Sequence, residues 1–309
     1  MGKCRVLIVG GTGYIGKRIV KASLDQGHPT YVIQRREIGL DIDKLQTLLE
    51  FKKQGARLVQ ASFDDHQSLV DAVKMVDVVI CTMSGVHFRS HNILLQLKLV
   101  EAIKEAGNVK RFLPSEFGMD PGRMENAMEP GRVTFDEKME VRKAIEEANI
   151  PYTYVVANCF AGYFVGNLSQ MDSLIPPTEK VRFYGDGNVK GVFMDEYDIA
   201  TYAIKTIDDP RTLNKTLYVR PPGNILSQRE LVEIWEKLTG KKLEKIYVSA
   251  QEFLAPIKSL DFASQVGVGH FYHIFYEGCL TNFEVKEEAS KLYPEVDYKR
   301  MDEYLKLYV

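Results

Sequence analysis

The sequence has few cysteines and no closely spaced pair of them. Its 309 residues include four cysteines, at positions 4, 81, 159 and 279, and none belongs to a Cys-x-x-Cys motif. Dense disulfide frameworks and zinc sites both need more closely spaced thiols. We therefore expect reduced thiols in a cytoplasmic protein, each of them a small buried hydrophobic side chain.

An excess of charge of one sign is also lacking. The chain carries 40 basic and 42 acidic residues, for a net charge of −2 at pH 7. Nucleic acids and anionic lipid surfaces attract proteins with a basic excess, so we expect neither as a partner. Long apolar runs are absent as well. The first run, at residues 6–9, ends in glycines and is far shorter than a signal-peptide core or the roughly 18 residues of a membrane span.

Strand and helix signals alternate through the first half of the chain. Apolar runs without polar alternation, each followed by helical periodicity, predict strands that are buried on both faces of a parallel sheet. We expect strands at residues 5–9, 31–33, 57–60, 77–81, 110–114 and 152–157, and helices at 14–25, 42–54, 68–75, 91–106 and 135–148. Right-handed crossovers between them give a doubly wound α/β domain of the Rossmann type.

The regular alternation of strand and helix signals ends after residue 157. An Asp-Gly turn between residues 181–184 and 191–194 predicts a β-hairpin. We also expect helices at 195–206, 227–238 and 249–260, strands at 216–219 and 243–248, and a Gly- and aromatic-rich stretch without assigned structure at 261–282. These signals predict a Rossmann domain at 1–157 and a smaller α/β substrate-binding domain at 158–309, with allowance for a later strand that rejoins the first sheet.

A glycine-rich loop follows the first expected strand and opens the first helix. It consists of Gly10, Gly11, Thr12, Gly13, Tyr14, Ile15 and Gly16. The first of the spaced glycines permits a tight turn, the second lets backbone N–H groups reach a pyrophosphate, and the third lets the helix pack close to the strand. The helix N-terminus adds partial positive charge. This context predicts dinucleotide binding, and the alternative is a tight turn without a ligand.

The end of the second expected strand indicates which dinucleotide binds. Domains that bind NAD place a carboxylate there for the ribose 2′-hydroxyl, whereas this chain reads Ile33-Gln34-Arg35-Arg36. Arginine offers a fork of donors to a 2′-phosphate. The sequence therefore favours NADPH, with Arg35 as the main phosphate contact and Lys44 as a second. A solvated charge is the alternative for Arg36 and Lys44.

The expected catalytic segment departs from the usual short-chain reductase pattern. Those enzymes use a serine and a Tyr-x-x-x-Lys motif in which the tyrosine is the general acid. Here Ser115 is present, but Thr134 stands four residues before Lys138. An aliphatic hydroxyl cannot replace a phenol as the acid, which excludes ordinary carbonyl reduction of that kind.

Lys138 therefore becomes the candidate general base. A partly desolvated amine can have its pKa lowered toward neutrality and then take a proton from a phenol. A para-hydroxybenzyl ether deprotonated in this way can expel its ether oxygen, and the resulting quinone methide accepts hydride at the benzylic carbon. The alternative is a surface lysine paired with Glu137 or another acid. Arg142, four residues later on the same helix face, is expected to contact the cofactor or to orient the surroundings of the lysine, or else to be exposed.

Glycine, aromatic residues and two histidines crowd the late segment at residues 267–276. This mixture is typical of a pocket for an aromatic ligand. A core aromatic cluster is the alternative, and we favour it for Phe271 and Phe275. For His270 a core histidine with satisfied hydrogen bonds stays open. The other histidines lack metal-ligand spacing, so we expect no metal.

These motifs resemble the isoflavone-reductase-like branch of the atypical short-chain reductases. The resemblance rests on the glycine loop, residues 84–87 and 111–121, Lys138, and residues 157–164 and 269–273, and it extends over nearly the whole chain. Within the branch, the chain is most similar to the pinoresinol–lariciresinol reductases. The resemblance implies stepwise reduction of a phenolic lignan by NADPH, from pinoresinol to lariciresinol and then to secoisolariciresinol.

The resemblance also implies roles for individual residues. Lys138 would be the general base, and Arg35, Lys44 and Arg142 would contact the cofactor. His270 would contact substrate, and Phe164, Val268 and Tyr272 would line the pocket that selects an enantiomer. Arg36 departs from the proline expected in this branch and would add a phosphate contact.

Several alternatives stay open. A phenylcoumaran benzylic ether reductase or an isoflavone reductase is the nearest, and a non-catalytic NADP(H)-sensing regulator belongs to another class. Enantiomer preference and the relative rates of the two reductions depend on pocket differences of about 1–3 kcal/mol. We expect a homodimer, the commonest closed assembly.

Overall fold

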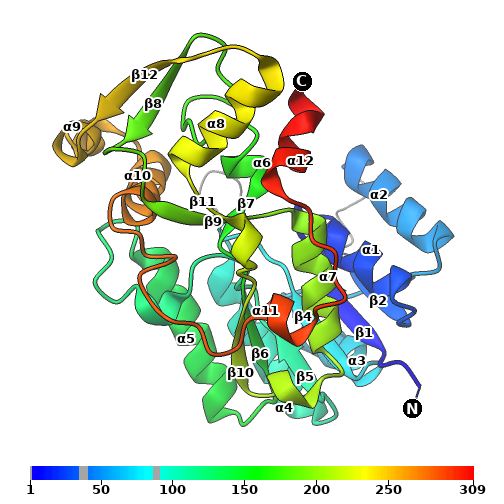
Figure 1. The fold of residues 1–309 in the computed structure, drawn as a ribbon. Coiled ribbons are helices and arrows are strands. Elements are labelled where there is room, and N and C mark those ends of the chain that lie inside the picture. The colour runs from blue at the N-terminus through cyan, green and yellow to red at the C-terminus, as the bar shows by residue number, and fades with distance from the viewer. Residues whose placement is uncertain (1, 35–40, 86–90) are drawn as a thin grey trace. The chain divides into compact units, whose positions relative to one another are not determined.

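The computed structural model describes residues 2–34, 41–85 and 91–309, and Figure 1 shows their course. The chain forms two compact units, each assembled from separate stretches. The first unit contains Met1–Glu116, Asp136–Val155 and Ala200–Leu217, and the second contains Phe117–Phe135, Val156–Ile199 and Tyr218–Val309. The units thus interleave along the sequence, and one change of unit, between Val155 and Val156, lies close to the division expected at residue 157.

The first unit is built on a five-stranded sheet with the order β3-β2-β1-β4-β5. Its strands are β1 (Val6–Val9), β2 (Thr30–Gln34), β3 (Arg57–Gln60), β4 (Val78–Cys81) and β5 (Arg111–Leu113). Every neighbouring pair is parallel, and Val6 of β1 lies opposite Thr30 on one side and Val78 on the other. The prediction of a doubly wound parallel sheet of the Rossmann type is confirmed.

Helices follow these strands. They are α1 (Gly16–Asp25), α2 (Ile42–Lys53), α3 (His66–Lys74), α4 (Gln96–Ala106) and α5 (Val133–Glu147), with a 3-10 turn at Ile93–Leu95. Aspartates cap two of them, because Asp41 accepts the backbone N–H of Lys44 and Asp65 accepts that of Ser68. Such caps stabilise a helix by about 1 kcal/mol.

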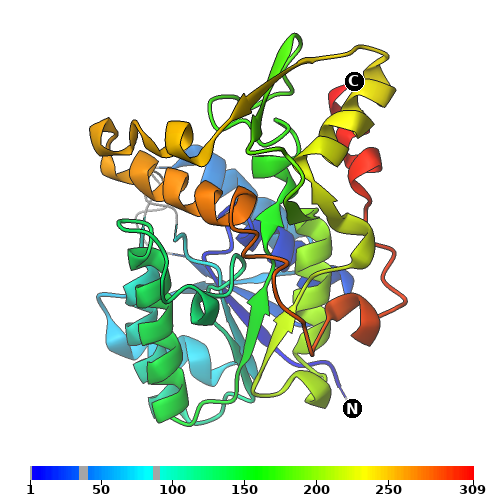
Figure 2. The ribbon, with the colours of Figure 1, turned by 60° about the vertical axis from the view of Figure 1, so that its left-hand side comes forward.

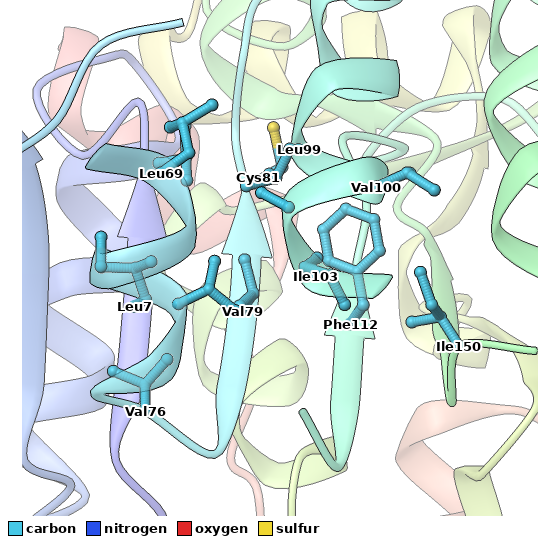
Figure 3. Packing of buried hydrophobic residues seen from close by; sticks show 14 of the residues in the cluster. Leu7, Leu69, Val76, Val79, Cys81, Leu99, Val100, Ile103, Phe112 and Ile150 are labelled. Carbon is cyan, nitrogen blue, oxygen red and sulfur yellow. The ribbon is translucent and has the colours of Figure 1, made fainter. Parts of the chain in front are cut away.

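One buried layer of the first unit lies between the sheet and helices that include α3, α4 and α5. Figure 3 shows Leu69 from α3 and Ile103 from α4 facing the strand side chains of Leu7, Val79 and Phe112. All five are at most 2% exposed. Burying each such side chain contributes about 1.5–3 kcal/mol, so this layer stabilises the sheet.

Two further strands, β6 (Thr153–Val156) and β10 (Lys215–Tyr218), pair with each other. Tyr152, just before β6, forms a parallel bridge with Phe112 of β5. The buried guanidinium of Arg111 in β5 contacts residues that follow it in sequence. Its Nη1 donates to Thr153 Oγ1 at 2.7 Å and to the Thr206 carbonyl at 3.0 Å.

The second unit contains two small sheets. One has the order β11-β9-β7 and the other pairs β12 with β8. Their strands are β7 (Cys159–Phe160), β8 (Lys180–Tyr184), β9 (Lys190–Met194), β11 (Ile225–Ser227) and β12 (Glu244–Val248). The helices are α6 (Ala161–Phe164), α7 (Glu196–Thr206), α8 (Gln228–Thr239), α9 (Ala250–Leu254), α10 (Phe262–Phe275), α11 (Ala289–Leu292) and α12 (Met301–Leu305).

The prediction of a β-hairpin at residues 181–194 is wrong. Both strands exist near the predicted positions, but β8 pairs in parallel with β12, and β9 pairs with β7 and β11. Gly185 and Gly187 have φ values of 61° and 73°, so the chain does turn where the Asp-Gly signal lies. A turn signal shows where a chain changes direction, whereas strand pairing depends on partners that are distant in sequence.

The helix α10 was missed by the sequence interpretation. Asp261 caps its first turn by accepting the backbone N–H of Ser264. Gly267 and Gly269 lower the intrinsic helix propensity, but packing of the apolar segment outweighs that cost of about 1 kcal/mol for each glycine. In Figure 2 α10 is the orange helix. The expected helix at 249–260 is also shorter, because α9 ends at Leu254 and a 3-10 turn follows at Ile257–Ser259.

A cluster of charges joins the start of α7 to the C-terminal segment. Asp195 accepts from Lys299 Nζ at 2.9 Å, and Asp198 accepts the backbone N–H of Lys299 at 2.8 Å. Burial, followed by the nearby Asp195 charge, raises the pKa of Asp198 to about 7. Across the described ranges, no helix combines the length and the apolar character needed to cross a membrane.

Candidate active site

The glycine loop joins β1 to α1 in the first unit. Gly10 has a φ of +80°, in the left-handed region that favours glycine. A Cβ on Gly10 would lie 2.9 Å from Thr82 Oγ1, and one on Gly16 would overlap the carbonyl oxygen of Gly10. The loop therefore closes tightly against the strand, and the first N–H groups of α1 remain close to it. This geometry fits the pyrophosphate of a dinucleotide.

Thr82 completes the loop and was not singled out in the sequence. Its hydroxyl donates to the Val9 carbonyl at 2.8 Å and packs beside Gly10 and Gly16. Thr82 directly follows β4, and the strand order reverses between β1 and β4. Ligands bind at this reversal point in doubly wound folds, so position relative to the expected strands could have identified it.

The other loop residues are spread over the turn. A Cβ on Gly11 would lie 2.7 Å from Val32 Cγ1, so the backbone packs closely on β2. Ile15 is the N-cap residue and is 8% exposed, and Tyr14 lies under the guanidinium of Arg18 at 4.3 Å from the ring centroid. The first turn of α1 carries no acidic residue to repel a phosphate. Cofactor contacts by Thr12, Tyr14 and Ile15 stay predictions.

The structure describes only one of the residues expected to contact the 2′-phosphate. Arg35 and Arg36 lie outside the described residues, just after the end of β2 at Gln34. Lys44 is in the first turn of α2, where its Nζ lies 2.6 Å from Asp41 Oδ2 and 45% of its side chain is exposed. A half-exposed ammonium can reach a ligand, so the role of Lys44 stays a prediction.

Lys138 is buried on α5. It is 8% exposed, and its Nζ donates to the backbone carbonyl of Glu116 at 2.8 Å. The alternative of a surface lysine is wrong, because the side chain is buried. The neighbouring Glu137 carboxylate bonds to His91 Nε2. Thr134, in the place of the usual tyrosine, is also buried. The structure thus provides a desolvated amine, and its role as a base stays a prediction.

The Arg142 side chain is paired with a buried acid. Its Nε and Nη2 donate to the two carboxylate oxygens of Glu116 at 2.9 and 2.8 Å. The guanidinium also lies over the Tyr154 ring, 4.4 Å from the centroid. Burial is the main cause that raises the pKa of Tyr154 well above its usual range. Glu116 was not a predicted site residue, because its spacing from Lys138 in sequence carries no signal.

The expected pocket residues gather on α6 and α10 of the second unit. Phe164 ends α6, and its ring stacks on Phe271 with centroids 5.1 Å apart. Val268 is 6% exposed, and Tyr272 stacks on Tyr276 at 5.5 Å. Val268 and Tyr272 share one face of α10, being four residues apart. Phe275, buried at 2%, belongs to a core cluster against which Phe271 packs, as expected.

Both late histidines bond to the segment that precedes α5. His270 Nε2 lies 3.2 Å from the Gly131 carbonyl and so carries the proton, and its ring packs against Phe135 at 4.9 Å. His273 Nε2 accepts the backbone N–H of Met128 at 2.9 Å, while its Nδ1 lies 2.5 Å from Glu277. Because Nε2 accepts, His273 is neutral and donates from Nδ1. In the part of the chain that is described, no group of three or more His, Cys, Asp or Glu side chains could hold a metal ion.

A family model for NmrA-like proteins matches residues 2–305. The chain belongs to the NmrA-like family. Among its relatives is an isoflavone reductase homolog of Lupinus albus, 75% identical with 100% of both chains covered. A bifunctional pinoresinol-lariciresinol reductase of Linum perenne is 70% identical, again over 100% of both chains. This NmrA-like chain also matches a solved structure of AtPrR2 with NADP+ and (+)pinoresinol, with a TM-score of 0.99, 67% identity and 100% of both chains covered.

Proposed function

We propose that this chain is an NADPH-dependent reductase that opens the benzylic ethers of furofuran lignans, first pinoresinol to lariciresinol and then lariciresinol to secoisolariciresinol. The observation that carries this proposal is the full-length similarity to the Linum perenne reductase, at 70% identity. A shared fold alone would not establish an activity. The glycine loop and the buried Lys138 supply the chemistry that such a reduction needs.

The cofactor would bind at the end of β1. Backbone N–H groups of the glycine loop and the α1 N-terminus would hold the pyrophosphate, and Arg35 and Lys44 would bind the 2′-phosphate. When bound, NADPH supplies the hydride that reduces the benzylic carbon. The absence of an acidic residue in the first turn of α1 supports this assignment.

Lys138 would act as the general base. Its N–H donates to the Glu116 carbonyl, so in the neutral amine the lone pair points away from that oxygen. The amine takes the phenolic proton of the substrate, the phenolate electrons form a quinone methide, and the benzylic C–O bond breaks. Once the benzylic carbon is reduced, the ring returns to a phenolate that recovers its proton from Lys138. Solvent protonates the released alkoxide.

The substrate rings would be held by α6 and α10. Phe164 and Tyr272 offer aromatic faces, and Val268 shapes the space between them. His270, which bonds through Nε2 to the Gly131 carbonyl, would contact the substrate. These residues would choose the enantiomer.

We also infer that the protein is a cytoplasmic homodimer. All four cysteines are free thiols, which supports a reducing compartment. Light scattering on the purified protein should give twice the chain mass, and a fluorescent fusion should distribute through the cytoplasm. A monomer mass would contradict the first part, and an organellar pattern the second.

The decisive experiment is a chiral analysis of products formed from racemic pinoresinol with NADPH. We expect lariciresinol and then secoisolariciresinol, with one enantiomer consumed faster. Replacing NADPH by NADH should slow the reaction. If NADPH stays unoxidised with both pinoresinol and lariciresinol, the proposal is wrong.

A second candidate is a phenylcoumaran benzylic ether or isoflavone reductase. The Lupinus albus relative, 75% identical, is named an isoflavone reductase homolog, which favours the isoflavone reductase. The same assay with a phenylcoumaran and an isoflavone would separate these activities. Binding of NADPH without turnover of any of these substrates would indicate the NADP(H)-sensing regulator instead.

A further inference from the structure

A buried ion pair lies next to the amine of Lys138. The Glu116 carboxylate binds Arg142 through two hydrogen bonds, and 2% and 9% of these side chains are exposed. The same residue, Glu116, accepts Lys138 Nζ at its backbone carbonyl, 2.8 Å away. One acidic residue therefore links the candidate base to an arginine one helical turn further along α5.

Stability alone is a weak reason for a pair in this position. Removing two charges from water costs nearly as much as their attraction returns, and apolar residues of similar volume often stabilise a fold as well or better. The two hydrogen bonds instead fix the orientation of both side chains, because a planar guanidinium and a carboxylate align in one plane. This favours a role in orienting the groups that Glu116 touches.

The pair is itself held on both sides. The Arg142 guanidinium lies over the Tyr154 ring, and the Tyr154 hydroxyl donates to Glu146 Oε1 at 3.1 Å. At the other end, the Glu116 N–H donates to the Pro114 carbonyl at 2.8 Å, and Phe117 has a φ of 41°. That conformation is uncommon for a residue other than glycine and persists only where surrounding contacts impose it. The carbonyl that receives Lys138 is thus fixed in place.

We propose that Glu116 and Arg142 are positioning residues for Lys138: their ion pair aims the amine and balances the charge around it. This inference rests on the role proposed for Lys138 as the base. Charged residues beside Lys138 include Glu116, whose carbonyl the amine contacts, Arg142, which binds the Glu116 carboxylate, and the adjacent Glu137, which bonds to His91. Because Glu116 and Arg142 carry opposite charges, each offsets the field of the other, and removing either one would leave the other uncompensated near the amine.

The test compares variants that remove one charge each. Glu116→Gln leaves the Arg142 charge, which disfavours the ammonium form of Lys138. Arg142→Gln leaves the carboxylate, which favours it. The acidic limb of the pH profile of kcat/KM should therefore move down in the first variant and up in the second, each by about one pH unit. A loss of folding alone cannot produce opposite shifts.

A second readout needs neither cofactor nor substrate. The Lys138 amine can be titrated by NMR in protein labelled with carbon-13 at lysine Cε, with its signal assigned by its loss in Lys138→Met. The same opposite shifts are expected. The exposed pair Lys143 and Glu147 on α5 provides matched controls, since Lys143→Gln and Glu147→Gln change the same charges at 73% and 68% exposed side chains. Neither control should shift the titration measurably.

One unpaired buried charge can unfold a protein, so the double variant Glu116→Gln/Arg142→Gln is the third measurement. This double variant carries neither charge, so the midpoint of its pH profile should return close to that of the unmodified enzyme. Its kcat should stay about tenfold lower, because the ion pair no longer holds the Lys138 amine in one orientation. Arg142→Lys keeps the charge and loses the two-point contact, so it should lower kcat without moving the midpoint.

The outcomes separate this inference from the proposed function. Shifts in the same direction, or no shift in folded variants, would overturn the positioning role. So would a tenfold weaker NADPH affinity in Arg142→Gln without any shift, since it would make Arg142 a cofactor contact as the family resemblance implies. If the unmodified enzyme reduces no lignan, the proposed function fails, and the NMR titration still tests the coupling of Lys138 to the pair.

Discussion

The two units place their candidate site residues in contrasting environments. In the first, Lys138, Glu116 and Arg142 form a buried set in which formal charges face each other. In the second, His270 and His273 bond to backbone groups, His273 also bonds to Glu277, and the His270 ring packs against Phe135. The contrast suggests that reactivity depends on charge in the first unit and that selection depends on shape in the second.

The largest effect is expected from Lys138→Met. General-base catalysis typically contributes about 10²–10⁴-fold, so kcat should fall by about 10³-fold while NADPH affinity is unchanged. Turnover of pinoresinol and fluorescence titration with NADPH provide the two measurements. Lys143→Met, on the exposed side of the same helix, is the control. Full turnover by the Lys138 variant would contradict a catalytic role for a charged side chain of the first unit.

Gly16→Ala should weaken NADPH binding by at least about tenfold, which corresponds to about 1.4 kcal/mol. The new Cβ would overlap the Gly10 carbonyl and push α1 away from the loop. The same substitution at Gly267 of α10 meets only Met171 Cε at 3.5 Å, and it should leave NADPH affinity unchanged. Isothermal titration of both variants with NADPH measures the difference, and equal affinities would contradict the assignment of the loop.

Val268→Ala should change selectivity more than rate. Removing methyl groups from a pocket changes discrimination by about 1 kcal/mol or somewhat more, so the preference between pinoresinol enantiomers should fall several-fold. The pH profile should not move, since no charge is altered. Phe262→Ala, at a side chain 52% exposed on the same helix, is the control. A shifted pH profile with unchanged enantiomer preference would contradict the role of Val268 in selecting the substrate by shape.

The smallest effect concerns stability and a charge within the second unit. The pKa of Asp198 is raised by burial to about 7, so its neutral form stabilises the fold fully below its unfolded value of 3.8. That contribution declines as the pH rises and is lost above about 7. Asp198→Asn should therefore become the more stable protein as the pH rises from 5 to 8.

The expected gain for Asp198→Asn is about 1 kcal/mol at pH 8, reduced from the full shift because the group is partly exposed. Thermal melts at several pH values measure it, with Asp302→Asn, in the exposed first turn of α12, as the control. A gain that is constant with pH would show that Asp198 is already charged at pH 5.

Local patterns predicted the first unit well because its signals lie within short stretches. The apolar run at Val6–Val9 and the spaced glycines that follow it define a strand, a turn and a helix. Lys138 was singled out because a threonine replaces the usual tyrosine four residues before it, and its role as the base stays a prediction. Glu116 was not, since its carbonyl contacts Lys138 and its carboxylate contacts Arg142, residues that lie far from it in sequence.

The second unit was harder because distant partners decide its structure. The β8 strand pairs with β12, some sixty residues later, where Lys180 lies opposite Glu244. The helix α10 forms despite Gly267 and Gly269, since packing outweighs local propensity. The capping box at Ser227 and Glu230, in contrast, was predicted and is confirmed, because both residues lie within one helical turn.

The pairing of β6 with β10 sets an order of events during synthesis. A nascent chain that has emerged only as far as residue 157 still lacks Lys215–Tyr218, the strand that covers the outer edge of β6. Until then, that edge offers unpaired backbone groups to any neighbouring strand. The nucleotide-binding unit therefore stays incomplete on the ribosome until residues 117–135 and 156–199 of the other unit have also been translated, and fragments cut near residue 157 should aggregate.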